Sequence, residues 1–191
     1  MNKKEINYWN NFYFKNNTIT DCSDFCNFIL EWFKNNDEIK NVIDCGRGNG
    51  RDSYKLSQKY NVNAIDSSGY IPKNNNNVTF YNNDFVTIDK SGFNLVYSRF
   101  TFHSITNEQQ EAFLKSVKGN SFLTIETRSK KCQNDELIHG KEHFRNYTDL
   151  KYLKDLLIKY NFEIIYIKED KDFAIYKNEN PFCIRVICKK K

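Results

Sequence analysis

The sequence predicts an open α/β sheet of mostly parallel strands with helices on both faces. Short runs rich in Val, Ile and Phe alternate with amphipathic stretches of helical length, which is the pattern of repeated β-α-β units. One of these runs leads directly into a loop with glycine at every second position, residues 46–50. The 191 residues contain no internal repeat or long linker and suffice for a sizeable core. We therefore expect a single domain over residues 1–191.

The first 35 residues are expected to combine an aromatic segment, residues 8–14, with one helix. Ser23 is a good N-cap for this helix, because its hydroxyl can accept a hydrogen bond from a free backbone N–H. Apolar side chains then recur at helical spacing, namely Phe25, Phe28, Ile29, Trp32 and Phe33. We expect residues 1–35 to cover a ligand site that the following loop forms.

The β-α-β units begin after this helix. A strand over residues 41–44 leads through the glycine loop into a helix that runs to residue 60, and a second strand ends at Asp66. Residues 67–77 form a short connection that contains Pro72, so we expect a turn in place of the usual crossover helix.

The remaining elements continue the alternation. Thr106 and Gln109 form a capping box that opens a helix through residue 118, and another helix is expected to begin at Thr148. Further strands are expected at residues 78–81, 93–98, 121–127, 163–168 and 182–188. Ligands of such sheets bind outside the carboxyl ends of the strands.

The glycine loop has the chemistry of a nucleotide-type cofactor site. Gly46, Gly48 and Gly50 let the backbone turn tightly and approach a ligand, because no Cβ stands in the way. The helix that follows directs free N–H groups and a positive dipole end at the same place. The third glycine comes one residue too early for a dinucleotide fingerprint, and no Gly-Lys-Ser/Thr follows as in a P-loop.

Acidic residues follow the first three strands. Asp44 directly precedes the glycine loop, Asp66 ends the second strand and Asp84 follows the third. A carboxylate at position 66 can accept both hydroxyls of a ribose, and one at position 84 can accept an exocyclic amine. Phe85 is expected to cover a purine face. These three positions lie at the same edge of the predicted sheet.

This set of residues resembles the S-adenosylmethionine (SAM) site of class I methyltransferases. In that family the first acid faces the methionine amino group, the second holds the ribose and the third holds the adenine. The resemblance implies a Rossmann-like sheet of seven strands with an antiparallel last strand, and SAM as cofactor. The cofactor-binding residues it implies are Tyr13, Asp44, Gly46, Gly48, Gly50, Arg51, Asp66, Ser67, Asp84, Phe85 and Ser98. The loop departs from the family pattern at Arg47, which we expect to project outward.

Further motifs are similar to a subgroup often met in surface-polysaccharide, capsule and lipopolysaccharide modification. They are Tyr8-Trp9-Asn10-x-Phe12-Tyr13, Gly48-Asn49-Gly50-Arg51-Asp52-Ser53, Ser98-Arg99-Phe100-x-Phe102-His103, Glu126-Thr127-Arg128, His143-Phe144-Arg145 and Asn180-Pro181. The subgroup implies O-methylation of a sugar hydroxyl or a phosphate group in a glycan or nucleotide-linked precursor. Methylation of RNA or of another small metabolite is an alternative, and so is a SAM-binding partner subunit without catalysis.

The candidate catalytic residues follow the fourth and fifth strands. They are His103, Arg99, Glu126, Arg128, His143 and Arg145. The arginines suit a phosphate or carboxylate, and His103 is either the base for a hydroxyl acceptor or a packing and capping residue. Glu126 and Arg128 either contact the substrate or pair with each other. Tyr8, Trp9 and Tyr13 are either core or lid aromatics or substrate contacts.

The amino-acid composition limits the classes of binding partner that we expect. Lys and Arg number 29 against 24 Asp and Glu, and they are scattered, which suits an anionic small molecule or glycan and disfavours a dedicated nucleic-acid surface. The six cysteines lack paired spacing, and no signal peptide or membrane-length apolar run is present, so we expect a cytoplasmic protein with reduced thiols. Cys132, His139 and His143 match no zinc pattern, and no metal is expected. The oligomeric state stays open.

Overall fold

The computed structural model describes residues 3–15, 18, 21–73, 77–135 and 143–191. The strands are β1 (Asn41–Cys45), β2 (Asn61–Asp66), β3 (Val78–Asn82), β4 (Leu95–Arg99), β5 (Phe122–Arg128), β6 (Phe162–Asp170) and β7 (Cys183–Lys190). The helices are α1 (Lys3–Lys15), α2 (Asp24–Trp32), α3 (Arg51–Leu56), α4 (Asn107–Ser116) and α5 (Leu150–Lys159). Two short 3₁₀ turns, η1 (Phe102–Ser104) and η2 (Lys130–Cys132), follow β4 and β5.

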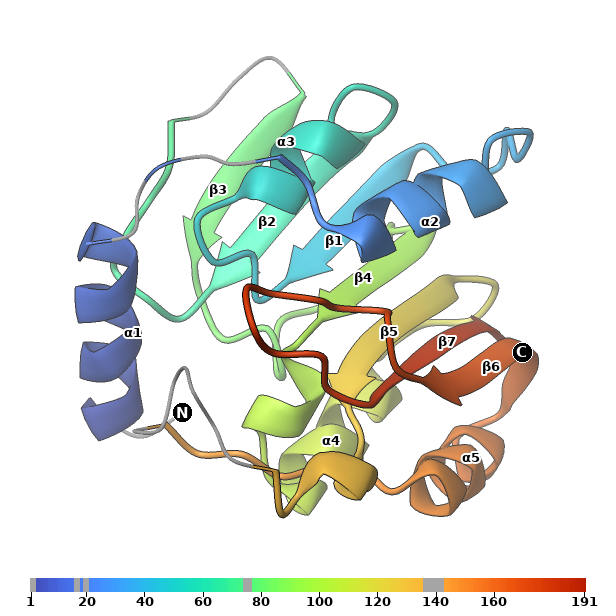
Figure 1. The fold of residues 1–191 in the computed structure, drawn as a ribbon. Coiled ribbons are helices and arrows are strands. Elements are labelled where there is room, and N and C mark those ends of the chain that lie inside the picture. Colours follow the sequence, from blue (N-terminus) through green and yellow to red (C-terminus); the bar gives the residue numbers. More distant parts are fainter. Residues whose placement is uncertain (1–2, 16–17, 19–20, 74–76, 136–142) are drawn as a thin grey trace.

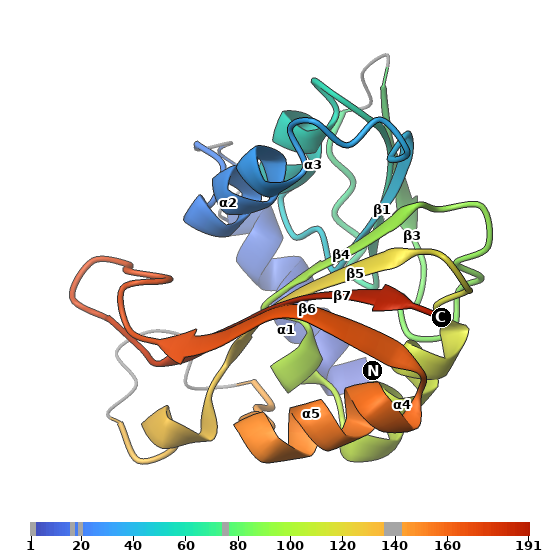
Figure 2. The same ribbon diagram turned by 90° about the vertical axis from the view of Figure 1, so that its right-hand side faces the viewer.

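The strands form one seven-stranded sheet in the order β3-β2-β1-β4-β5-β7-β6 (Figure 1). Strands β1 to β5 are parallel, whereas β7 is antiparallel to both β5 and β6. Helices α2 and α3 cover one face of the sheet, and α4 and α5 cover the other (Figure 2). The predicted fold class, including the antiparallel last strand, is confirmed.

The strand order places the topological switch at β1. The chain moves outward on one side through β2 and β3, and on the other side through β4 and β5. In open α/β sheets, the carboxyl ends of the strands beside such a switch leave room for a ligand. The glycine loop lies there, because it directly follows β1.

Two predicted helix starts are confirmed by their hydrogen bonds. The Ser23 hydroxyl accepts from the backbone N–H of Cys26 at the start of α2. Thr106 and Gln109 form both reciprocal bonds of the capping box at the start of α4. These caps are local patterns of side chain and backbone, which explains why the sequence alone reveals them.

The helices differ from the expectation in four places, one of which is that α4 ends at Ser116 and not at residue 118. The aromatic N-terminal segment is itself a helix, α1. Helix α3 ends at Leu56, and the chain continues to residue 60 in turns. Helix α5 begins at Leu150, because the Asp149 side chain accepts from the N–H of Tyr152 and serves as its cap. As expected, the described residues between β2 and β3 contain no helix.

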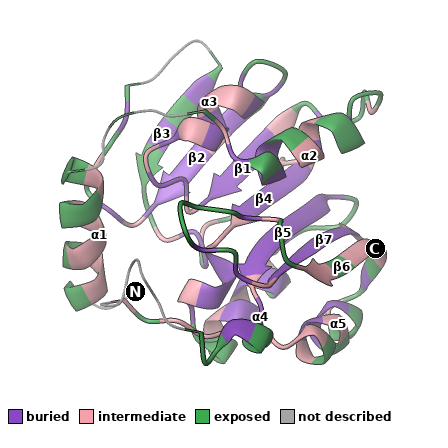
Figure 3. Cartoon of the chain, in the orientation of Figure 1, coloured by how far each residue is buried: buried purple, intermediate pink, exposed green. Residues whose placement is uncertain are grey.

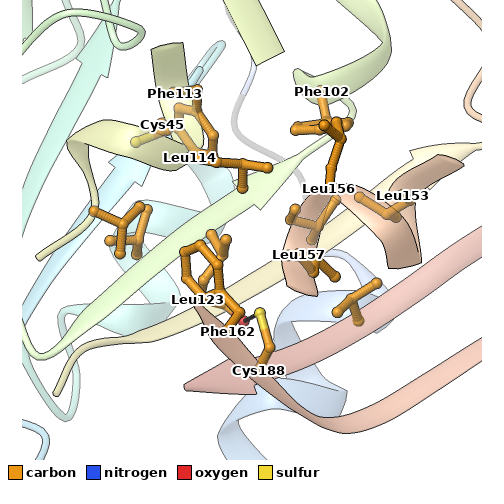
Figure 4. Close-up of a cluster of buried hydrophobic side chains, with 14 of the residues drawn as sticks. Cys45, Phe102, Phe113, Leu114, Leu123, Leu153, Leu156, Leu157, Phe162 and Cys188 are labelled. Carbon is orange, nitrogen blue, oxygen red and sulfur yellow. Dashed lines mark hydrogen bonds between the residues drawn. The ribbon is translucent and has the colours of Figure 1, made fainter. Parts of the chain in front are cut away.

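The hydrophobic core lies on both faces of the sheet. On the α4 and α5 face, Phe113, Leu114, Leu153 and Leu157 pack against buried strand residues such as Leu123 (Figure 4). A second cluster joins α2 and α3 to the opposite face. Figure 3 shows buried residues concentrated in the strands, whereas α1 contains none. None of the described helices is long and apolar enough to cross a membrane.

A buried carboxylate fixes the helices beside the glycine loop. The backbone N–H and the hydroxyl of Ser23 both donate to Asp52, each at 2.7 Å, and the Tyr97 hydroxyl donates to it at 2.8 Å. The cap of α2, the first turn of α3 and strand β4 therefore meet at one side chain. This junction holds the start of α3 in place and thereby orients the preceding loop.

Candidate functional site

The glycine loop adopts a backbone that requires glycine. Gly46, Gly48 and Gly50 have φ values of +82°, +57° and +87°. A Cβ on Gly46 would lie 1.9 Å from Cγ2 of Thr101, and one on Gly48 would lie 2.8 Å from the Tyr13 hydroxyl. The N–H groups of Gly46 and Arg47 both donate to the Ile65 carbonyl at the end of β2. The loop is therefore closely packed on several sides.

Asp44 is a buried carboxylate at the end of β1. Its Oδ2 accepts a 2.5 Å hydrogen bond from the Ser53 hydroxyl on α3. Burial raises its pKa to about 7, with further increases from Asp52 and Asp66, although the Ser53 bond and Arg47 act in the opposite direction. Near neutral pH this group titrates, and its ionised form suits a cationic ligand.

Asp66 and Asp84 order the two neighbouring loops. Asp66 accepts from the N–H of Gly48 at 3.0 Å and from that of Ser68 at 2.8 Å. Asp84 accepts from the N–H of Val86 at 2.8 Å. Each carboxylate lies at or beyond the carboxyl end of its strand, as the sequence indicates. The three acids therefore occupy the same sheet edge as the glycine loop.

The remaining residues expected to bind the cofactor differ in their contacts and burial. The hydroxyl of Ser98 is 2.6 Å from that of Thr101, and the Ser67 hydroxyl donates to the Asn83 carbonyl. Arg51 begins α3. Phe85 departs from the expectation that it covers a purine. It is 4% exposed and packs in the core, with its ring against that of Phe113 on α4.

Helix α1 lies beside the carboxyl ends of β1 and β2 (Figure 1). Tyr13 contacts the glycine loop, since its ring fills the space next to Gly48. Asn10 accepts a hydrogen bond from the N–H of Gly69 in the loop after β2. The Trp9 ring is 4.7 Å from the ring of His143, measured between centroids. The helix thus bridges the loops that follow β2 and β5.

Of the two alternatives for Glu126 and Arg128, a pairing with each other is wrong. Glu126 is fully buried and accepts from Nε of Arg99 at 3.0 Å and from Nε of Arg185 at 2.7 Å. Arg128 instead pairs with Glu179 at 2.9 Å. Neighbouring strands present their guanidinium groups to Glu126 from both sides, whereas Arg128 extends toward the β6–β7 connection.

Sequence reasoning missed Arg185 and Glu179. A signal for Arg185 was available, because it is a charged residue within the otherwise apolar run of β7 and so requires a buried partner. Nothing in the sequence near Glu179 indicates its contact with Arg128. That contact arises only when the β6–β7 connection folds back over the sheet.

His103 is buried and its imidazole is held in one tautomer. The backbone N–H of Arg128 donates to its Nδ1 at 3.1 Å, so the proton of the neutral ring resides on Nε2. Burial, reinforced by the charges of Arg128 and Arg145, holds the pKa of His103 well below its usual value. The Nδ1 lone pair already accepts this N–H, and the low pKa disfavours the protonated ring, so the geometry favours the packing role.

Positive side chains gather around Phe100, directly after β4. The guanidinium carbon of Arg99 lies 4.4 Å from the Phe100 ring centroid and that of Arg128 lies 5.7 Å away. Phe100 itself has φ of +57°, an uncommon conformation for a bulky residue. Burial, with Arg145 and Arg128 nearby, lowers the pKa of His143 to about 4, so that ring is neutral. The rim thus contains arginines and uncharged imidazoles.

Arg47 does not project outward as expected. It is 5% exposed, and its guanidinium donates to the carbonyls of Gly48 and Tyr70. Within the described part of the chain, no three metal-binding side chains gather as a site; His139 lies outside the described residues.

The comparisons with known proteins identify the fold. A structure of a SAM-dependent methyltransferase from Anabaena variabilis matches with a TM-score of 0.75 and 17% identity, over 100% of this chain and 96% of that one. One from Methanosarcina mazei matches with a TM-score of 0.68 and 17% identity, over 90% and 99%. This chain has the fold of SAM-dependent methyltransferases.

A third similar structure contains bound molecules. It is the Burkholderia thailandensis 1,6-didemethyltoxoflavin N1-methyltransferase with 1,6-didemethyltoxoflavin and S-adenosylhomocysteine, with a TM-score of 0.64, 17% identity and coverage of 88% of this chain and 78% of that one. No protein-family model and no curated protein matches the sequence. At this level of identity, the structural matches show the fold alone.

Proposed function

We propose that this protein is a SAM-dependent methyltransferase whose acceptor is an anionic small molecule. The observation that carries the proposal is the arrangement of Asp44, Asp66 and Asp84 around a glycine loop at the switch point of a methyltransferase-type sheet. Asp44 suits the ammonium of the methionine moiety, and Asp66 suits the ribose hydroxyls. When bound, SAM supplies an activated methyl group on a sulfonium.

The acceptor atom we propose is an oxygen, in a phosphate group or sugar hydroxyl of a glycan or nucleotide-linked precursor. Among these, the geometry favours phosphate, because an anionic oxygen needs no base. Among the described candidates, His103 is locked in one tautomer and Glu126 is engaged by two arginines. Arg99 is the proposed anion ligand, because its Nη groups have no hydrogen-bond partner among the described residues.

The chain's own contribution to the reaction is then positioning and exclusion of water. Arg99 would orient the anion, and Phe100 would hold Arg99 and Arg128 in place by contact with their guanidinium groups. Helix α1 would cover the reactants, since Tyr13 already lies against the glycine loop and Trp9 against His143. We propose that residues 1–35 serve as this cover.

The test combines SAM binding with methyl transfer. Calorimetry measures the Kd for SAM, and labelled SAM is then offered with sugar phosphates, nucleotide sugars, neutral sugars, small heterocycles and RNA. We expect label in the phosphate-containing compounds. Arg99→Met should abolish transfer and retain SAM binding, whereas Lys118→Met, an exposed residue before β5 at the opposite sheet edge, should change neither.

Other outcomes select other functions. Label in the neutral sugars would assign a hydroxyl acceptor and return His103 to consideration as a base. Label in the heterocycles would favour the kind of reaction that the toxoflavin methyltransferase performs. Label in RNA would contradict the proposed acceptor class. SAM binding with no transfer to any compound would favour a non-catalytic partner subunit.

A further inference from the structure

Arg47 is a buried cation within the glycine loop itself. Its Nη1 donates to the Gly48 carbonyl at 2.6 Å, and its Nη2 donates to the Tyr70 carbonyl. The guanidinium carbon lies 5.6 Å from the centroid of the Phe80 ring on β3. One side chain thus joins the loop after β1, the connection after β2 and strand β3.

The described residues of the segment that Arg47 holds, the connection after β2, form no helix. Side chains from three other segments form hydrogen bonds with the connection after β2. Arg47 donates to the Tyr70 carbonyl, and Asn10 of α1 accepts from the N–H of Gly69. The Tyr54 hydroxyl of α3 donates to the Lys73 carbonyl. Of these, only Arg47 comes from the glycine loop. Its two Nη groups donate to different carbonyls, so a single residue fixes the loop and the connection relative to each other.

Arg47 is also electrostatically coupled to the carboxylates of the site. Burial lowers the pKa of its guanidinium, whereas Asp66 and Asp44 raise it. The groups that act on Asp44 come from three elements: Ser53 and Asp52 on α3, Arg47 on the loop and Asp66 on β2. In this set Arg47 is the cation, and Asp52 and Asp66 oppose ionisation of Asp44.

We propose that Arg47 is a positioning residue for SAM, which clamps the β2 connection to the glycine loop and offsets the mutual repulsion of Asp44 and Asp66. The clamp sets where the ribose-binding turn lies, and the charge of Arg47 favours the ionised form of Asp44. The inference rests on the proposed function, because it assigns SAM to this site.

The first experiment needs no SAM. Urea unfolding of the full chain is compared for the wild type, Arg47→Met and Arg47→Lys at about pH 5 and about pH 8. Met removes the charge, whereas Lys retains it without the two-carbonyl fork. The destabilisation by R47M should be larger at the higher pH, where Asp44 is ionised, and that by R47K should be nearly independent of pH. Equal pH dependence in both variants would overturn the role of the charge.

The second experiment measures the Kd for SAM between about pH 6 and about pH 8. R47M should bind about ten-fold more weakly at neutral pH, with its binding midpoint about one pH unit above that of the wild type. R47K should bind more weakly at an unchanged midpoint, and Lys55→Met on α3 should match the wild type. Wild-type affinity and midpoint in R47M would overturn the proposal.

The two experiments separate the inference from the function on which it rests. If the wild type binds no SAM at any pH, the proposed function fails, and the unfolding data still decide whether Arg47 offsets the carboxylates. If R47M does not fold, R47K still tests the role of the charge. A pH midpoint of SAM binding in R47K that differs from that of the wild type would overturn this role.

Discussion

At the scale of single residues, Asp44 decides how the site responds to pH. Its pKa is about 7, chiefly because it is buried. In the unfolded chain, the carboxyl has an ordinary value near 4. Asp44 therefore makes its full contribution to stability only at acidic pH, and that contribution is lost as the pH rises toward 7. Ionisation costs stability but prepares the group for a cation.

We predict that the affinity for SAM rises with pH through about 7. Binding should be about ten-fold weaker at one pH unit below this value than well above it, because about one tenth of the Asp44 side chains are then ionised. Asp44→Asn should bind weakly with little dependence on pH. Calorimetric titration of both proteins tests this, and a pH-dependent D44N would contradict the assignment.

His103 illustrates how a hydrogen bond decides a chemical role. Its Nδ1 is the acceptor for the backbone N–H of Arg128, which occupies the lone pair that a base would use. We predict that His103→Asn, whose amide oxygen can accept from the same N–H, retains more turnover than His103→Ala. The alanine variant should lose about 1 kcal/mol of unfolding free energy, because that partly buried N–H loses its partner.

The measurements for His103 are kcat and urea unfolding of the two variants. A base would make both variants equally inactive. At saturating SAM, where the ionisation of Asp44 no longer limits binding, the kcat of the wild type should also lack a limb near pH 6.5, because the pKa of His103 is held well below that value. A limb that disappears in H103N would restore the base role.

At the scale of elements, α1 is attached through contacts with loops rather than through a core. It contains no buried residue, and Tyr13 meets the glycine loop at a position where any Cβ on Gly48 would collide with it. A helix held in this way can affect ligand binding without determining whether the sheet folds.

We predict that Tyr13→Ala weakens SAM binding about ten-fold while the unfolding midpoint changes little. Phe12→Ala serves as the control, since the Phe12 ring is 40% exposed. Calorimetry and thermal unfolding measure the two effects. A large loss of stability in Y13A would instead make α1 a structural part of the core.

At the scale of the whole molecule, one buried ionic cluster links three strands. Glu126 on β5 accepts from Arg99 on β4 and from Arg185 on β7. Arg185 also donates to the Phe173 carbonyl, and its guanidinium lies over the rings of Phe25 and Phe173. The cluster therefore connects the parallel part of the sheet, its antiparallel end and helix α2.

We predict that Glu126→Gln destabilises the protein by about 3 kcal/mol, because two adjacent guanidinium groups lose their counter-charge in a buried place. Lys151→Ala, which removes an exposed ion pair with Asp155 on α5, should give no measurable change. Chemical denaturation compares the two variants with the wild type. A neutral effect of E126Q would show that the arginines find water or other partners.

The sequence by itself determined the order of the strands and of the helices after residue 23, the glycine loop and the positions of the three acids. These features depend on local spacing: alternation of apolar runs, glycines two residues apart, and capping residues three apart. Residues such as Ser23, Thr106 and Asp66 act on backbone groups nearby or lie at a strand end, so their roles are visible without the fold.

Only the tertiary structure decided how the charged side chains pair and which of them are free. Glu126 and Arg185 are 59 positions apart, and Arg128 and Glu179 are 51 apart. A buried charge takes the partner that the fold places within reach, and sequence neighbours on one strand need not be that partner. For the same reason, the inward direction of Arg47, the burial of Phe85 and the tautomer of His103 followed from packing between distant segments.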